Sequence, residues 1–338
     1  MFEYSYQVLT NILQSFFETA ICRGDNGFVR LLIKVNANVN GKTFEGLTPA
    51  ILAAKKNQTD VLKVLIENGS DINTQGDYIS TTALHEAAYE GHLQAVMVLI
   101  ENGANIDQQD EVDYTPLIVA TENDQPEVTT YLLDKGANIN LQNTYGTSPL
   151  LGAVTAKNLN IVRLLVERGA NINGKNMHGN TPLMLAVGNA WLEGAEILIK
   201  NGARIDEANN DSYTPFFHSV SEGYIEITNL LIENGACVNN KHSVNLRSPL
   251  HLSIGCNQIE TSKILVLHGA DFDARDMFLS TPLHYATSRN FAETTLFAIE
   301  NGASMTARND VRNTPLESAI DEKGIEVVKT ICLFEHLK

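Results

Sequence analysis

A short motif of the type Thr/Ser-Pro-Leu recurs along this sequence with a nearly constant spacing. Its first residues are Thr48, Thr82, Thr115, Ser148, Thr181, Thr214, Ser248, Thr281 and Thr314. A glycine follows each of the first eight at one fixed distance, at Gly69, Gly103, Gly136, Gly169, Gly202, Gly235, Gly269 and Gly302. This regular period predicts a row of similar units in which each unit packs only against its neighbours.

Each unit has the pattern of two short helices. In Thr115-Pro116, the threonine can cap a helix and the proline suits its first turn. At a fixed distance after the start of the motif, most units have a residue that tolerates left-handed backbone. Such a residue would end this first helix. These residues are Gly24, Asn57, Gly91, Asp124, Gly223, Asn257 and Asn290. A second helix, such as residues 161–167, has apolar residues three and four apart and ends at the glycine.

These features resemble the ankyrin repeat, and the resemblance covers nearly the whole chain in about ten tandem units. The run Thr281-Pro282-Leu283-His284-Tyr285-Ala286 matches the signature of that family in full. The resemblance implies an all-α repeat solenoid, an ankyrin stack of helix-turn-helix units joined by β-hairpin loops. The glycine expected two residues before the motif is present at Gly46, Gly146 and Gly179. Other residues replace it at Ser80, Asp113, Ser212, Leu246, Leu279 and Arg312, where we expect less regular hairpin tips.

The chain ends differ from the regular units and divide the sequence into three parts. We expect a capping helix and a degenerate first repeat in residues 1–40, eight tandem repeats in 41–308, and a capping repeat in 309–338. Terminal units of such stacks need a polar outer face. The first helix is expected to turn one apolar side to the stack, formed by Leu9, Ile12, Leu13, Phe16, Phe17, Ala20 and Ile21.

The composition narrows the class of partner and the compartment. The 338 residues include 24 basic and 40 acidic side chains, a formal charge of −16. This charge argues against binding to nucleic acid or to anionic membranes, which requires lysine and arginine. No apolar run is long enough for membrane insertion. The four cysteines have neither zinc-site nor disulfide-framework spacing, which favours reduced thiols and a cytoplasmic or nuclear location.

No motif for catalysis, a cofactor or a metal is found. His85, His251 and His284 stand at the fourth motif position, where a hydrogen bond back to the motif Thr/Ser is expected instead of metal binding. An acidic cluster in one connector is predicted to be a solvated hairpin tip, because its spacing does not fit an EF-hand. Its members are Asp107, Asp110, Glu111 and Asp113.

The resemblance implies a binding surface made of hairpin tips and a concave groove along the first helices. Large apolar side chains at these positions are the candidate partner contacts, since aromatic residues make good binding anchors. They are Phe44, Tyr78, Ile79, Tyr89, Tyr114, Tyr145, Met177, Tyr213, Met277 and Phe278. Acidic residues between them, such as Glu90, Glu122 and Glu222, favour a basic or amphipathic protein segment.

The expected function is a protein-protein interaction scaffold or adaptor, monomeric and without catalysis. One alternative is a recognition arm of a larger assembly, such as a ubiquitin ligase, a channel or a secreted pathogen effector. An enzyme with a site in the groove and a passive structural linker are two others. The resemblance also implies possible hydroxylation of hairpin asparagines, at Asn40, Asn73, Asn140, Asn173 and Asn239.

Overall fold

The computed structural model describes residues 2–336, with side chains from residue 10 onward. This part of the chain has 20 helices and no β-strand. The helices fall into two compact units that divide after Met177. The repeat prediction is therefore confirmed, although the connectors in this part of the chain are hydrogen-bonded turns without β-strands.

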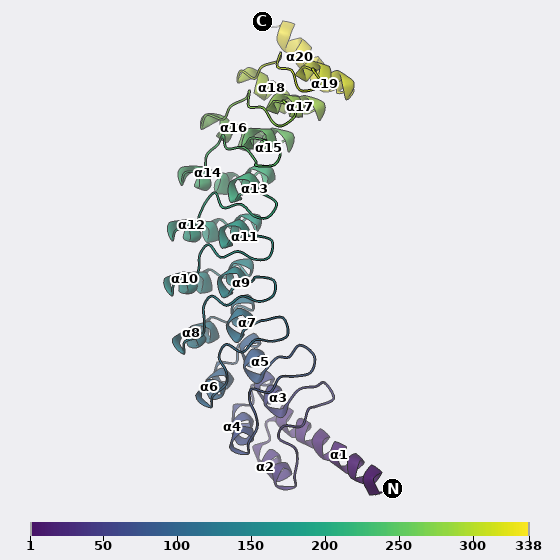
Figure 1. The fold of residues 1–338 in the computed structure, drawn as a ribbon, viewed down its shortest axis with the longest axis vertical. Helices are drawn as coiled ribbons and strands as arrows, with labels where there is room; N and C mark the ends of the chain where they lie inside the picture. Colours follow the sequence, from purple (N-terminus) through teal and green to yellow (C-terminus); the bar gives the residue numbers. More distant parts are fainter. Residues whose placement is uncertain (1, 337–338) are drawn as a thin grey trace. The chain divides into compact units, whose positions relative to one another are not determined.

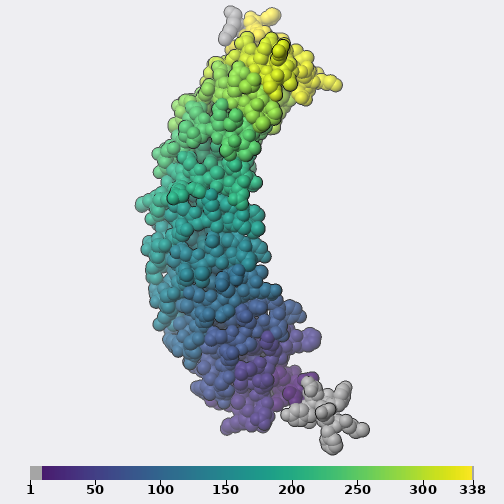
Figure 2. Space-filling view, in the orientation of Figure 1, coloured from purple at the N-terminus to yellow at the C-terminus, as the bar shows by residue number. Residues whose placement is uncertain are grey.

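The first unit contains five helix pairs, whose first and second helices form two separate rows (Figure 1). Its helices are α1 (Phe2–Arg23), α2 (Asn26–Lys34), α3 (Pro49–Lys55), α4 (Thr59–Glu67), α5 (Ala83–Tyr89), α6 (Leu93–Glu101), α7 (Pro116–Glu122), α8 (Pro126–Asp134), α9 (Pro149–Thr155) and α10 (Leu159–Glu167). Helix α5 packs against α3 and α7, and α6 packs against α4 and α8. Each repeat therefore contacts its neighbours in sequence order, as the colours of Figure 2 also show.

The second unit repeats this arrangement with five more pairs. Its helices are α11 (Pro182–Gly188), α12 (Leu192–Lys200), α13 (Pro215–Glu222), α14 (Ile225–Glu233), α15 (Pro249–Gly255), α16 (Ile259–Leu267), α17 (Pro282–Ser288), α18 (Ala292–Glu300), α19 (Pro315–Asp321) and α20 (Ile325–His336). The core in both units lies between the two helix rows. Leu84, Leu99, Leu250 and Leu265 illustrate it, because each is almost completely buried.

The motif residues form the helix starts as the sequence predicts. The Thr48 hydroxyl accepts a hydrogen bond from the Ile51 N–H at 3.2 Å, and Thr115 caps Ile118 in the same way at 3.3 Å. The proline that follows each of them occupies the first helical turn, where no backbone N–H is needed. The cap and the proline together fix the start of these two-turn helices.

Left-handed backbone occurs at every position where the sequence predicts a helix end. The first of these residues, Gly24, has φ 69°, and the last, Asn290, has φ 58°. It also occurs at the same register in Lys157, Ala190 and Lys323, although these residues carry no such signal. The packing of two helices at a fixed angle therefore imposes this conformation even where the residue type does not favour it.

The expectation of less regular hairpin tips holds at Ser80 and Leu246, where the turn is one residue longer, as the Gly76 N–H to Thr81 carbonyl and His242 N–H to Arg247 carbonyl bonds show. It is wrong at the other four positions. Leu279 has φ 55° and Asp113 has φ 62°, close to the 73° of Gly46. The reason is a turn in which a carboxylate or amide oxygen holds two N–H groups. In one connector the Asp110 carboxylate accepts from Val112 and Tyr114, at 3.0 and 2.8 Å. These bonds offset the cost of left-handed backbone at a non-glycine residue.

The first helix only partly matches its predicted apolar face. Phe17, Ala20 and Ile21 are buried, whereas Ile12 and Phe16 are 48% and 54% exposed. The N-terminal part of α1 projects beyond α2 and α3 (Figure 1). The side chain of Leu9, also placed on this face, lies outside the described residues.

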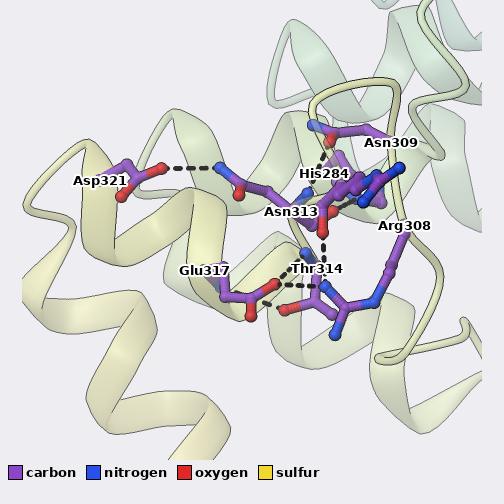
Figure 3. A network of polar contacts seen from close by, with 8 residues as sticks. His284, Arg308, Asn309, Asn313, Thr314, Glu317 and Asp321 are labelled. Atoms are coloured by element: carbon purple, nitrogen blue, oxygen red, sulfur yellow. Dashed lines mark hydrogen bonds and ion pairs between the residues drawn. The ribbon is translucent and has the colours of Figure 1, made fainter.

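A network of polar contacts surrounds the start of α19 in the last repeat (Figure 3). The Glu317 carboxylate accepts from the Thr314 N–H at 2.6 Å and pairs with Arg308 at 3.1 Å. In return, the Glu317 N–H donates to the Thr314 hydroxyl at 3.3 Å. The side chain of Asn313 donates to Asp321 at 2.7 Å. These bonds satisfy the N-terminal groups of α19.

Candidate functional site

Most of the candidate contact residues lie on the protein surface. Tyr78 is 78% exposed and Phe44 is fully exposed. The others that are exposed are Ile79, Tyr89, Tyr145, Met177, Met277 and Phe278. Two candidates differ, because Tyr114 and Tyr213 are partly buried. Their rings form the walls of pockets between repeats and do not project from the tips.

The first unit has an open pocket of about 450 Å³ that brings three candidates together. Its lining comes from α3, α5, α7 and the two connectors around α5, namely Lys55, Ile79, Thr81, His85, Glu86, Tyr89, Asp110, Val112, Tyr114, Val119, Glu122 and Asn123. Ile79, Tyr89 and Tyr114 supply apolar and aromatic surface. By the sequence period, Ile79 and Tyr89 belong to one repeat and Tyr114 to the next, and the stacking of the two repeats puts them around one space.

Three carboxylates and one ammonium group give this pocket a negative charge. Glu86 pairs with Lys55 at 3.2 Å. Burial raises the pKa of Glu122 above its usual value, and a hydrogen bond with the Tyr114 hydroxyl opposes that shift. Burial, together with Glu122, raises the pKa of Tyr114. The pocket therefore holds a partly desolvated carboxylate that would gain from a nearby cation.

The next repeat leaves space for the side chain of Glu122. A Cβ atom added at Gly152 of α9 would lie 2.7 Å from the Glu122 Cγ. The absence of a side chain at Gly152 thus leaves the space that Glu122 occupies. Glu122 is one of the acidic groove residues expected from the sequence, but nothing in the sequence indicates that it is partly buried.

The motif histidines are structural, as predicted. His85 Nδ1 accepts from the Thr82 N–H at 3.2 Å, and its Nε2–H donates to the Tyr114 carbonyl at 2.9 Å. Burial lowers the pKa of His85 and favours this neutral ring. The sequence indicated the first contact only. Among the side chains that the structure describes, no three from His, Cys, Asp or Glu gather in a way that could hold a metal ion.

Two carboxylates of the acidic connector accept hydrogen bonds from backbone N–H groups. Asp110 holds its own turn, and the Asp107 carboxylate accepts from the Asn138 N–H of the next repeat at 2.9 Å. Glu111 is exposed, as predicted for a tip. The four cysteines are free and exposed.

In the second unit, Tyr213 lies beside a different pocket of about 460 Å³. Its ring meets that of His242 edge-on, with 5.0 Å between the centroids. Met277 and Phe278 project from the connector before α17. Tyr213 lies in a different repeat from these two residues, and the structure does not gather the three into one pocket.

The hairpin asparagines form a ladder between repeats. The Asn73 amide donates to the Gly103 carbonyl at 3.3 Å and accepts from the Asn105 N–H at 2.9 Å. Asn40 and Asn239 bond in the same way to the repeat that follows them, and the Asn140 oxygen accepts from Asn171. Hydroxylation at these sites and at Asn173 stays a prediction, which mass spectrometry of the chain from animal cells would test.

Comparison with known protein families gives matches to repeats of one kind. The description "Ankyrin repeats (3 copies)" matches residues 75–143, 117–209 and 183–276. The description "Ankyrin repeats (many copies)" matches residues 50–96. Together these matches cover more than half of the chain.

Curated relatives match over shorter segments. Inversin from Canis lupus familiaris and from Homo sapiens are 30% identical over 116 residues, which is 34% of this chain and 11% of each relative. The human neurogenic locus notch homolog protein 1 is 31% identical over 102 residues, 30% of this chain and 4% of that protein. The aligned part is thus a small fraction of each relative. None of the described helices has the length and apolar character needed to cross a bilayer.

Proposed function

This chain belongs to the ankyrin-repeat family, and we propose that it is a protein-binding scaffold or adaptor without catalysis. Repeats of this family are in general protein-protein interaction modules. The proposed partner presents a basic or amphipathic segment to the connector tips and to the exposed side of the first helices. We place the main contact on the repeats between residues 41 and 177.

The observation that carries this proposal is a set of exposed apolar side chains on four of five consecutive connectors. Phe44, Tyr78, Tyr145 and Met177 stand three or four residues before their motifs, and all four are exposed. Aromatic rings bury a large area at a low cost in side-chain entropy. Their connectors are held by hydrogen bonds between repeats, so little ordering is needed on binding.

The charge of this surface supports the choice of partner. The pocket beside Tyr89 contains Glu86, Glu122 and Asp110 against a single lysine. The whole chain carries a formal charge of −16. Complementary charge increases association rates and disfavours acidic partners. A basic segment with a few apolar side chains fits both properties of the surface.

Affinity capture with quantitative mass spectrometry tests this function. Wild-type chain is compared with a Phe44→Ala/Tyr78→Ala variant and with a Leu31→Ala/Val35→Ala control. The control removes two apolar side chains at α2 that are about half exposed, 54% and 53%. We expect the tip variant alone to lose its partner while all three proteins melt at the same temperature. Equal capture by all three would discard the proposed surface.

The alternative role, a recognition arm of a larger assembly, is favoured by one observation. The relatives match this chain over 11% and 4% of their own length, so in them such repeats form part of a longer protein. A ubiquitin ligase, a channel or a secreted effector would each carry further domains. The complete open reading frame distinguishes this role from that of a separate adaptor.

We also propose a monomeric state and a cytoplasmic or nuclear location. The free, exposed cysteines support a reducing compartment, since exposed thiols oxidise readily outside it. Light scattering of the purified chain and imaging of a tagged chain in cells test the two proposals. A dimeric mass or a secreted chain would contradict them.

A further inference from the structure

The second unit shows how an arginine packs in the space between two repeats. The guanidinium of Arg247 lies over the ring of Tyr285, 4.8 Å from its centroid. Arg247 Nε also donates to the Tyr285 hydroxyl at 2.8 Å, and this hydroxyl donates to the Asp276 carboxylate at 2.6 Å. The ring and the hydroxyl of Tyr285 therefore hold the guanidinium of Arg247, and the Asp276 carboxylate holds that hydroxyl in place.

The pocket beside α5 and α7 is the equivalent place in the first unit. Ser248 begins the fifth motif after that of Thr82, and Thr281 begins the fifth after that of Thr115. By this register, Asp110 corresponds to Asp276. The position of Arg247 is taken by Thr81, and that of Tyr285 by Val119, both of which have smaller side chains. The first unit thus keeps the carboxylate but has no arginine of its own at this place.

Other groups in this pocket suit a guanidinium from outside. Tyr89 and Tyr114 line the pocket, where the second unit has Gly255 and Ser280 at the same register. Glu122 adds a carboxylate that is not ion-paired to any lysine or arginine within the described part of the chain. Lys55 is already paired with Glu86. The pocket therefore has an excess of negative charge next to two aromatic rings.

We propose that this pocket receives one arginine side chain from the basic segment of the partner, an assignment that rests on the proposed binding function. Arginine fits better than lysine for two reasons. Its planar guanidinium stacks on aromatic rings, and its several N–H donors reach separate carboxylates together. A lysine ammonium is a compact, strongly hydrated charge that would gain less from the two tyrosines.

Methyl-labelled NMR of the full chain tests the proposal directly. Ile79, Val112 and Val119 line the pocket and supply methyl probes. The ligands are the peptide acetyl-Gly-Arg-Gly-amide and its lysine and citrulline counterparts, the last being neutral and similar in shape to arginine. We expect the arginine peptide to shift these three methyl signals, with an affinity about tenfold higher than either counterpart.

Two variants assign the binding to the pocket. Glu122→Gln should weaken the arginine peptide about tenfold, because it removes the unpaired carboxylate. Glu90→Gln removes the same charge from a neighbouring exposed residue and should change the affinity by less than about twofold. Unchanged signals of methyl groups away from the pocket show that each variant is folded.

A third variant fills the pocket from within. Thr81→Arg places an arginine at the register of Arg247 and should abolish the shifts caused by the arginine peptide. Equal binding of the citrulline or lysine peptide, or full binding to Thr81→Arg or to Glu122→Gln, would overturn the assignment. If partner capture still depends on Phe44 and Tyr78 in that case, the scaffold function stands and only the arginine assignment fails.

Discussion

His85 Nε2 lies 2.9 Å from the carbonyl oxygen of Tyr114, which belongs to the next repeat. The same contact joins His251 to Ser280 at 2.9 Å and His284 to Asn313 at 3.1 Å. In each case the other ring nitrogen lies at the start of the histidine's own helix. One neutral imidazole thus caps its own repeat and ties it to the next one.

This geometry makes the stability of the chain depend on pH. Burial lowers the pKa of His251 from 6.5 to about 4, and it also lowers the pKa of His85 and His284. The unfolded chain therefore takes up protons first as the pH falls. The stability that the neutral His251 confers is fully present above about pH 6.5 and is lost as the pH falls towards about 4. Urea unfolding at pH 7.5 and pH 5 should show a lower midpoint at pH 5.

Two variants isolate the histidine contribution. His251→Asn should lower the midpoint at pH 7.5 and reduce its change between the two pH values. His268→Asn, at an exposed position after α16, should leave that change as in the wild type. If His251→Asn kept the wild-type pH dependence, the buried ring would not be its source.

Two glycines of the first unit should respond in opposite ways to the same substitution. Gly136 has φ 90° with no atom within 4 Å of an added Cβ, so Gly136→Ala meets backbone strain alone. We expect it to cost about 1 kcal/mol of unfolding free energy. Gly27 is the second residue of α2, at an exposed site with ordinary φ, and Gly27→Ala should add about 0.5 kcal/mol because alanine lowers the entropy of the unfolded chain. Denaturant unfolding measures both, and a loss of stability in the two variants alike would refute the explanation.

The left-handed Leu279 offers a stabilising substitution. Its φ is 55°, at the position that Gly46, Gly146 and Gly179 occupy in other repeats. Leu279→Gly removes the steric strain of the side chain and should raise the unfolding free energy by about 1 kcal/mol. The side chain is 48% exposed, so little packing is lost. A lower melting temperature in this variant would show that the side chain contributes more than its strain costs.

The hydroxyl of Tyr285 should be necessary for a stable connector before α17. It is a partner of Asp276, which is only 2% exposed, at 2.6 Å. Tyr285→Phe would leave one carboxylate oxygen without this bond and should cost about 2 kcal/mol. Tyr78→Phe is the control, since Tyr78 is 78% exposed and should show no change. Burial and Asp276 raise the pKa of Tyr285 to about 12, so its ultraviolet titration should lie above that of the exposed tyrosines.

Local signals in the sequence are sufficient to predict the repeat, its two helices and their ends. These depend on local signals, since Thr48 caps a helix three residues away and Gly69 ends one at its own position. The period shows where the signals recur, and the exposure of Tyr78 and Phe44 also follows from their place at a turn. Local interactions act over a few residues, and these features can therefore be predicted from one unit.

The surface that adjacent repeats form together depends on how they pack. The pocket around Tyr89, Tyr114 and Glu122 depends on which side chains from adjacent repeats reach the same space. The left-handed backbone of Leu279 and the exposure of Phe16 also depend on the tertiary structure. In each case the decisive contacts, or their absence, involve residues that are distant in sequence. Their energies depend on packing and desolvation, which the pattern of a single repeat does not contain.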